Sequence, residues 1–184
     1  MSRVADFARA LRSLRMELGA PVDGASLAAL RIVFGVVMTA AVVRFAAMGW
    51  IDEIYVAPRF HFHYWGLAWV RPLPAPWIYL HFAALGASAA LVALGLHYRV
   101  AVALFVVLFG WVEFAEAATY LNHYYAITLV ALLLLACPAH HVASLDAWRA
   151  RRRGRPLPRT VPTAALLALR AQLAIVYFFA GVAK

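Results

Sequence analysis

The 184-residue sequence contains one cysteine, one lysine and only eight acidic residues. The single thiol, Cys137, cannot form a disulfide within the chain, and it excludes a metal site built from several cysteines. Charged residues make up 14% of the chain and hydrophobic residues 66%, with a mean hydropathy of +0.79. This composition leaves too few charged side chains to cover a water-soluble globule. We therefore expect an integral membrane protein of the all-α class.

Most of the positive charge lies in two arginine clusters, Arg3–Arg15 and Arg149–Arg159, which flank hydrophobic segments. Basic clusters beside spans usually face the cytoplasm and anionic lipid headgroups, so the formal net charge of +9 indicates contact with lipid rather than nucleic acid. The first long apolar run begins only at Leu27 and lacks a small-residue cleavage site. We therefore expect it to remain as a membrane anchor rather than to be removed as a signal peptide.

Five apolar segments approach or reach the length of ~20 residues that a helix needs to cross a hydrocarbon core of ~30 Å. They are Leu27–Met48, Trp77–Leu96, Val100–Glu116, Tyr120–Cys137 and Thr163–Ala183. The short connections at 97–99 and 117–119 predict antiparallel neighbouring helices. The longer connections, 49–76 and 138–162, have room for structure of their own.

These patterns predict a polytopic bundle of about five transmembrane helices in residues 27–184, preceded by a basic amphipathic segment in residues 1–26. Apolar residues of the N-terminal segment recur at helical spacing opposite arginines, which favours a helix lying in the membrane interface. A solvated basic tail is the alternative. The distribution of Lys and Arg among alternate connections predicts a cytoplasmic N-terminus and places residues 49–76 outside.

The same topology gathers several polar side chains near the outer face. They are Glu113, Glu116, Asn122, His123 and Lys184. A charged group at membrane depth costs ~2.5 to 3.5 kcal/mol on insertion scales, so each needs a partner or a function. Thr119 is a candidate N-cap, which would put His123 in the first turn of a helix, where the positive helix end favours neutral imidazole. A capping or interhelical hydrogen bond is the alternative role for His123, and a water-facing loop is the alternative place for Glu116.

Lys184, the only lysine, follows the last apolar run. An arginine cannot act as a base, whereas a lysine buried against apolar walls loses its proton well below its ordinary pKa of ~10.4. A helix C-terminus favours the ammonium form instead. The residues alone therefore leave open a catalytic amine and an ordinary terminal charge.

Two further groups of polar residues lie within or beside the spans. Arg31 and Arg44 lie inside the first span, where a guanidinium either extends to a headgroup or serves a site. His61-Phe-His63 and His140-His141 lack a third ligand at a recognisable spacing, so we expect no metal site.

Six short motifs occur together and in order. They are Leu30–Gly35, Arg71–Pro74 followed by Tyr79, Gly95–Arg99, Asn122–Tyr124, Ser144–Asp146 and Val176–Lys184. Together they resemble the membrane domain of vitamin K-dependent gamma-carboxylase, and they are most similar to its bacterial relatives with a horizontally transferred transmembrane (HTTM) domain. The resemblance covers nearly the whole chain and implies the N-terminal membrane portion of such a protein, in a bacterial inner membrane with Lys184 at the outer face.

The resemblance implies a carbon–carbon lyase activity. In the carboxylase, a lysine at the position matching Lys184 deprotonates reduced vitamin K, and oxygen converts the quinol into a base that removes the γ proton of a glutamyl residue. Carbon dioxide then adds to the carbanion while vitamin K becomes its epoxide. The resemblance thus implies Lys184 as the catalytic base on a menaquinol-type hydroquinone, with His123 assisting and a glutamyl peptide or protein as acceptor. Residues expected to support the site or bind substrate are Asn122, Glu116, Tyr124 and Arg31.

Two departures from the family pattern bear on these expectations. The family usually has Asp-Lys-Thr before the Asn-His motif, whereas this chain has Glu116-Ala-Ala-Thr119, so a basic residue is missing near the expected site. The segments that follow the lysine in the family are also missing, so we expect a chain truncated at its C-terminus. A non-catalytic quinone- or lipid-binding bundle and an inactive fragment of the enzyme are therefore the alternative functions.

Overall fold

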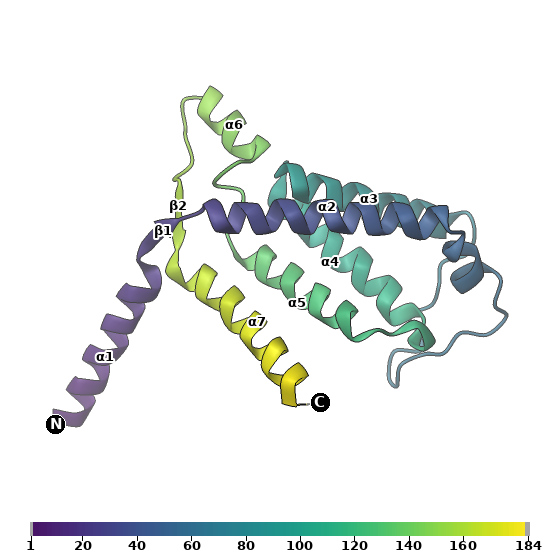
Figure 1. Cartoon of the computed structure of the whole chain (residues 1–184), viewed down its shortest axis with the longest axis horizontal. Helices are drawn as coiled ribbons and strands as arrows, with labels where there is room; N and C mark the ends of the chain where they lie inside the picture. The colour runs from purple at the N-terminus through teal and green to yellow at the C-terminus, as the bar shows by residue number, and fades with distance from the viewer. Residues whose placement is uncertain (1, 183–184) are drawn as a thin grey trace.

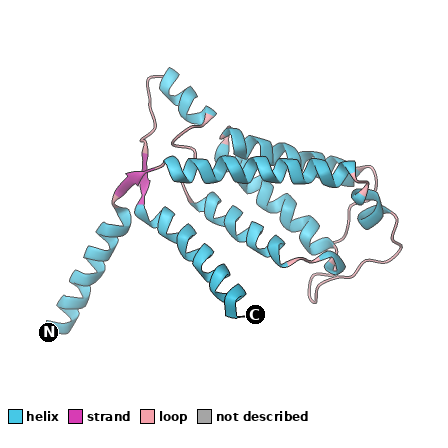
Figure 2. Cartoon of the chain, viewed as in Figure 1, coloured by secondary structure: helices cyan, strands magenta, loops and turns pink. Residues whose placement is uncertain are grey.

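The computed structural model describes residues 2–182, which form a helical bundle with one small sheet (Figures 1 and 2). Seven α-helices make up most of this range: α1 Ser2–Gly19, α2 Ala25–Ala47, α3 Trp77–Leu94, α4 Tyr98–Ala115, α5 Asn122–Ala136, α6 Leu145–Arg152 and α7 Thr163–Val182. The remaining elements are the π-helix η1 Asp52–Val56, the 3-10 helix η2 Ala117–Thr119, and the strands β1 Pro21–Asp23 and β2 Thr160–Pro162.

The structure confirms an all-α membrane bundle. Within the described range, four helices are long and apolar enough to cross a membrane, namely α2, α3, α4 and α7. The fifth, α5, is apolar but has 15 residues. At 1.5 Å per residue it is about 22 Å long, shorter than the segment 120–137 predicted for it. It begins late because Tyr120 and Leu121 have non-helical ψ angles of 129° and 137°, and it ends where Pro138 favours an extended Cys137.

The start of α5 corrects one local prediction. Thr119 does not cap this helix, because its hydroxyl donates to the carbonyl of Glu116 at 3.2 Å. Leu121 precedes α5 instead, and its side chain makes no capping hydrogen bond. His123 nevertheless lies in the first turn of α5, as the sequence predicted.

A two-stranded antiparallel sheet joins the start of α2 to the start of α7, two segments that lie far apart in the sequence (Figure 2). Its register places Val22 opposite Val161. Thr163 extends the pairing, because its backbone N–H and its hydroxyl both donate to the Ala20 carbonyl, at 3.0 and 2.9 Å. The sheet therefore fixes the position at which α7 begins, directly after the Arg-rich connection 138–162.

The core of the bundle lies between α2, α3 and α4, with α3 packed against both α2 and α4 (Figure 1). Its central buried side chains include Ile78 and Leu85 of α3 and Phe105 of α4. The helices α2 and α3 approach closely at Gly35, where an added Cβ would lie 2.4 Å from the backbone nitrogen of Ala93. Only a residue without a side chain fits there.

The first and last helices have less contact with this core. Figure 1 shows α1 extending away from the bundle and α7 diverging from α5. The side chains of residues 173–182 on α7 are exposed. The helix predicted in the N-terminal segment is present as α1, while its place in the membrane interface stays a prediction.

Gly35→Ala should lower the thermal unfolding midpoint of the detergent-solubilised protein. The added methyl group meets the Ala93 backbone, and overpacking of this kind costs about 1 to 3 kcal/mol, more than the helix propensity gained over glycine. Gly110→Ala in α4 is the matched control, because nothing lies within 4 Å of a Cβ there. Equal midpoints for the two variants would contradict the close approach of α2 and α3.

Candidate functional site

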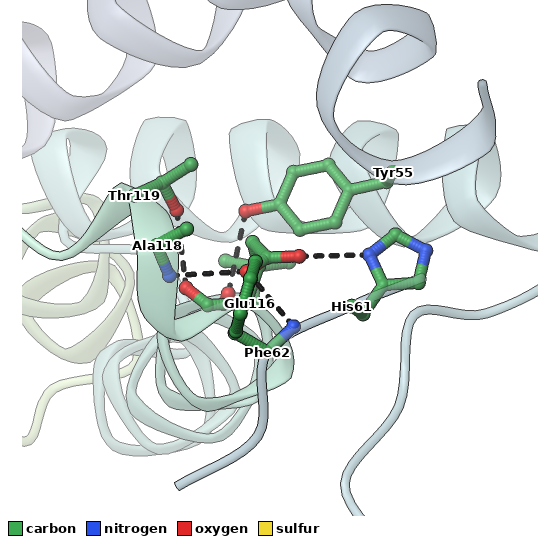
Figure 3. Close-up of polar contacts among 7 residues, drawn as sticks. Tyr55, His61, Phe62, Glu116, Ala118 and Thr119 are labelled. Atoms are coloured by element: carbon green, nitrogen blue, oxygen red, sulfur yellow. Dashed lines mark hydrogen bonds and ion pairs between the residues drawn. The ribbon is translucent and has the colours of Figure 1, made fainter. Parts of the chain in front are cut away.

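A buried carboxylate organises the end of the bundle where α4 ends and α5 begins. Glu116 is 5% exposed, and one of its oxygens accepts the backbone N–H groups of Phe62 and Ala118, at 3.2 and 3.0 Å. The other oxygen is 2.9 Å from Nδ1 of His61 (Figure 3). A backbone bond from Ala117 N–H to the Phe62 carbonyl, at 2.8 Å, completes the junction. Glu116 therefore holds the aromatic connection 57–76 against the turn between α4 and α5.

Tyr55 of η1 lies beside this junction and also reaches α4. Its hydroxyl donates to the Val112 carbonyl at 3.3 Å, and its side chain is buried (Figure 3). Burial raises the pKa of the Tyr55 hydroxyl above its ordinary value. The phenol therefore remains protonated and acts as a hydrogen-bond donor at neutral pH.

A cavity of about 480 Å³ opens next to Tyr55, bounded by the second half of α2, by η1, and by parts of α3, α4 and α5. Most of its wall is aliphatic or aromatic. The aromatic side chains are Phe45, Trp50, Tyr55, Phe82, Phe109, Tyr120 and Tyr124. Four polar groups also line it: Arg44, Glu113, Thr119 and His123. An apolar cavity with a few polar groups is the usual form of a small-molecule site.

His123 and Tyr124 are the sequence-predicted site residues that line this cavity. Their rings meet edge to face, with centroids 4.7 Å apart, and Tyr124 packs in the same way on Phe109 at 5.9 Å. In residues 2–182, neither the His123 imidazole nor the Tyr124 hydroxyl has a hydrogen-bond partner. Both groups are therefore available to a ligand in the cavity.

The two charged groups of the wall have partners within the protein. The Glu113 carboxylate accepts the Thr128 hydroxyl at 2.8 Å, which joins α4 to α5. The Arg44 guanidinium lies over the Trp50 ring, 5.3 Å from its centroid. These contacts fix one negative and one positive group at the edge of an otherwise apolar cavity.

The remaining sequence-predicted site residues lie elsewhere. Asn122 is exposed at the start of α5, and Glu116 lies behind the wall, where its carbonyl accepts the hydroxyl of Thr119. Arg31 lies at the opposite end of the bundle. Lys184 lies outside the described residues. The roles of all these residues in a reaction stay predictions.

Arg31 is fully buried and is surrounded by backbone carbonyl groups. Its Nε donates to the carbonyl of Ala139 at 3.1 Å, and its terminal nitrogens donate to those of Val92, Ala93 and Ala143 at 2.7, 2.5 and 2.6 Å. These acceptors belong to the end of α3 and to the turn after α5. The four bonds account for a guanidinium in the bundle interior without any ligand.

Sequence reasoning did not single out the aromatic part of the cavity wall. Tyr55, Phe82 and Phe109 come from three different elements and have no common spacing in the sequence. Aromatic residues are common in membrane spans and at interfaces, so their presence in the sequence did not indicate a binding site. Only the packing of η1 against α3 and α4 brings them together.

The family described as HTTM domain matches residues 20–184. No solved structure matches the chain.

Replacing Arg31 with methionine should destabilise the bundle. The change removes the side-chain donor from the carbonyls of Ala93, Ala139 and Ala143 and leaves Val92 with only the Gly95 N–H, and disrupting a buried charged network typically costs about 3 to 5 kcal/mol. Arg44→Met is the matched control on the same helix, because Arg44 is exposed. Thermal unfolding in detergent measures the difference. A midpoint for Arg31→Met as high as that of the control would show that the four bonds contribute little.

Replacing Glu116 with alanine should release the connection 57–76. Hydrogen bonds to a charged group contribute about 1.5 to 3 kcal/mol each, and this carboxylate accepts two backbone N–H groups besides contacting His61. Amide hydrogen exchange should therefore become at least 10-fold faster at Phe62 and Ala118. Glu53→Ala, at an exposed acid of η1, should leave these rates unchanged. Unchanged protection in Glu116→Ala would refute the anchoring role.

Proposed function

Because this chain belongs to the HTTM domain family, we propose that it is a vitamin K-dependent gamma-carboxylase-like membrane protein that acts on reduced vitamin K. The HTTM domain is linked to the carboxylase family, and the helices have the length and composition of an integral membrane protein. The finer proposal is that a lysine base, Lys184, starts quinol oxidation and that this drives epoxidation and carboxylation of glutamyl residues.

The observation that carries the proposal is the cavity beside α5. Its volume of about 480 Å³ lies within the range of ~300 to 1,000 Å³ typical of small-molecule sites. Its aromatic walls suit the flat fused ring of a menaquinol-type hydroquinone, whose isoprenoid tail belongs in lipid. The open hydrogen-bonding groups of His123 and Tyr124 suit the two quinol hydroxyls, so the residues present fit this group.

Two residues at the wall, His123 and Tyr124, have proposed roles. His123, in the first turn of α5, accepts a hydrogen bond from a quinol hydroxyl through a ring nitrogen. Tyr124 donates to the second oxygen, and aromatic side chains line the cavity around the ring. When bound, reduced vitamin K would supply, together with oxygen, the basicity needed to remove the γ proton of a glutamyl residue. Lys184 takes the quinol proton in this proposal.

The proposal also assigns an orientation. The Arg-rich connection between α5 and α7 and the N-terminus would face the cytoplasm, in keeping with the bias of Lys and Arg toward that side. His123, the cavity and Lys184 would then lie toward the outer face of a bacterial inner membrane.

A second candidate function is quinone or lipid binding without turnover. One observation favours it: the two charged groups of the cavity wall, Glu113 and Arg44, both have partners within the protein, which leaves His123 and Tyr124 to bind a ligand. An arginine cannot act as a base at usable pH. The cavity would then hold a quinone ring and leave its redox state unchanged.

The test is epoxide formation from reduced vitamin K in membranes that contain the protein, with oxygen, carbon dioxide and a glutamyl peptide supplied. Epoxide should form with the wild-type chain and be lost in Lys184→Ala. His123→Asn should lower the rate about 10²-fold or more, the usual effect of losing a group that assists proton transfer. His97→Asn is the matched control, because His97 lies at the other end of the bundle and its left-handed φ of 46° suits asparagine.

The possible results separate the two functions. Unchanged epoxidation in Lys184→Ala would refute the assignment of the base. Photolabelling of the cavity by a quinone analogue, without epoxide from the wild-type chain, would establish binding without turnover. Absence of both labelling and epoxide would contradict the quinone site itself.

A further inference from the structure

A second cavity lies at the other end of the bundle and has no part in the proposed quinol site. It has a volume of about 900 Å³ and lies between α6, the segment leading to β2 and the sides of α2 and α3. Its wall includes Ile32, Leu94, Trp148, Arg151, Leu157 and Arg159. One part of this wall is thus apolar, and another carries two guanidinium groups.

The positive charge at this cavity is not neutralised by the protein. Residues 138–162 contain six arginines and a single acid, Asp146. Both oxygens of that carboxylate already accept hydrogen bonds, from the backbone N–H groups of His97 and Tyr98 at 3.0 and 2.9 Å. Within residues 2–182, the guanidinium groups of Arg151 and Arg159 have no hydrogen-bond or ion-pair partner. An anionic ligand would supply the missing charge.

The cavity arginines are distinguished from the other arginines of this connection by their place at the cavity, since Arg153 and Arg155 do not line it. Arg152 stacks over the Trp148 ring, 4.2 Å from its centroid, and Arg149 lies 3.5 Å from Nε2 of His97. Arg151 and Arg159 line the cavity instead. They approach it from two separate segments, α6 and the residue before β2, so the positive charge lies on two sides of the opening.

Both segments are anchored to the bundle. Ser144 caps α6 by accepting the Ala147 N–H at 2.9 Å, and the backbone N–H of Asp146 donates to the Gly95 carbonyl at 3.0 Å. The carbonyl of Arg159 accepts the Gly24 N–H at 3.1 Å, at the start of α2. The backbone that carries the two arginines is therefore fixed before any ligand binds.

The apolar part of the wall identifies the class of ligand. Leu94 is 52% exposed, Trp148 is 48% exposed, and the neighbouring surface of α2 carries the exposed side chains of Val33 and Val36. A free phosphate ion would use only the arginines and leave this apolar surface uncovered. A phospholipid would use both parts, with its phosphate between the arginines and its acyl chains along α2 and α3. Tryptophan is also the residue typical of the headgroup level of a bilayer.

We propose that the cleft between α6 and the adjoining sides of α2 and α3 binds an anionic phospholipid, whose headgroup phosphate contacts Arg151 and Arg159 and whose acyl chains lie on the apolar side of the cleft. This site is independent of the quinol cavity at the other end of the bundle. It would fix the depth and tilt of the bundle at the surface of one leaflet.

The test is lipid retention by the full 184-residue chain, purified in neutral detergent and titrated with phosphatidylglycerol or phosphatidylcholine under native mass spectrometry. Phosphatidylglycerol should bind at least 10-fold more tightly than phosphatidylcholine. The double variant R151Q/R159Q should weaken phosphatidylglycerol binding roughly 10- to 30-fold, as expected from losing about two favourable charge contacts. Soluble glycerol phosphate should not compete at concentrations comparable to the lipid.

The matched control is R153Q/R155Q, which removes the same charge from the same connection at residues that do not line the cleft. Its affinity should remain within about 3-fold of the wild-type value. A second variant, Leu94→Glu, places a carboxylate on the exposed wall and should weaken phosphatidylglycerol binding even if the arginine variant folds poorly. Equal losses in the two arginine doubles would show general charge attraction and overturn the proposal. Competition by glycerol phosphate at the lipid's own concentration would replace the lipid site with a phosphate site.

Discussion

The structure depends on one buried side chain that satisfies backbone carbonyls where helices end. Within a bilayer, a backbone polar group without a partner costs several kcal/mol, so helix ends buried in the bundle need donors. Arg31 provides them for the last turn of α3 and for the turn after α5. The surrounding chain is built closely around this group: a Cβ at Gly95 would lie 2.7 Å from its guanidinium, and the left-handed φ of 62° there also requires glycine. The positions of α2, α3 and α5 at this end follow from it.

At the other end of the bundle, a buried negative side chain satisfies backbone groups, as the positive Arg31 does at the first end. Glu116 accepts backbone N–H groups from the connection 57–76 and from η2, as Arg31 donates to carbonyls. Between these two junctions, α5 begins late and has 15 residues. The residues before α5 are extended and lie along the wall of the cavity, together with His123 and Tyr124. The cavity therefore arises from the same local backbone that shortens α5.

The two clefts of the protein suit ligands of different chemistry at opposite ends. The cleft beside α5 is aromatic, with open hydrogen-bonding groups and one charged residue of each sign, which suits a flat quinol. The cleft beside α6 combines arginines with aliphatic side chains, which suits an anionic amphiphile. Both ligands would reach the protein from the membrane, and the exposed apolar faces of α2 and α7 provide surfaces in contact with lipid.

The sequence by itself determined the class of protein and most of its helices, because runs of apolar residues are local and their length can be compared with the thickness of a bilayer. It also placed His123 correctly in the first turn of α5. It missed the late start of α5, the pairing of β1 with β2, the four acceptors of Arg31 and the partners of Glu116. Each of these depends on contacts between segments that lie far apart in the chain or on backbone angles without a local pattern. Tertiary structure alone decided that Arg31 lies far from His123, because only packing shows which buried charge is satisfied by the backbone and which polar groups remain open to a ligand.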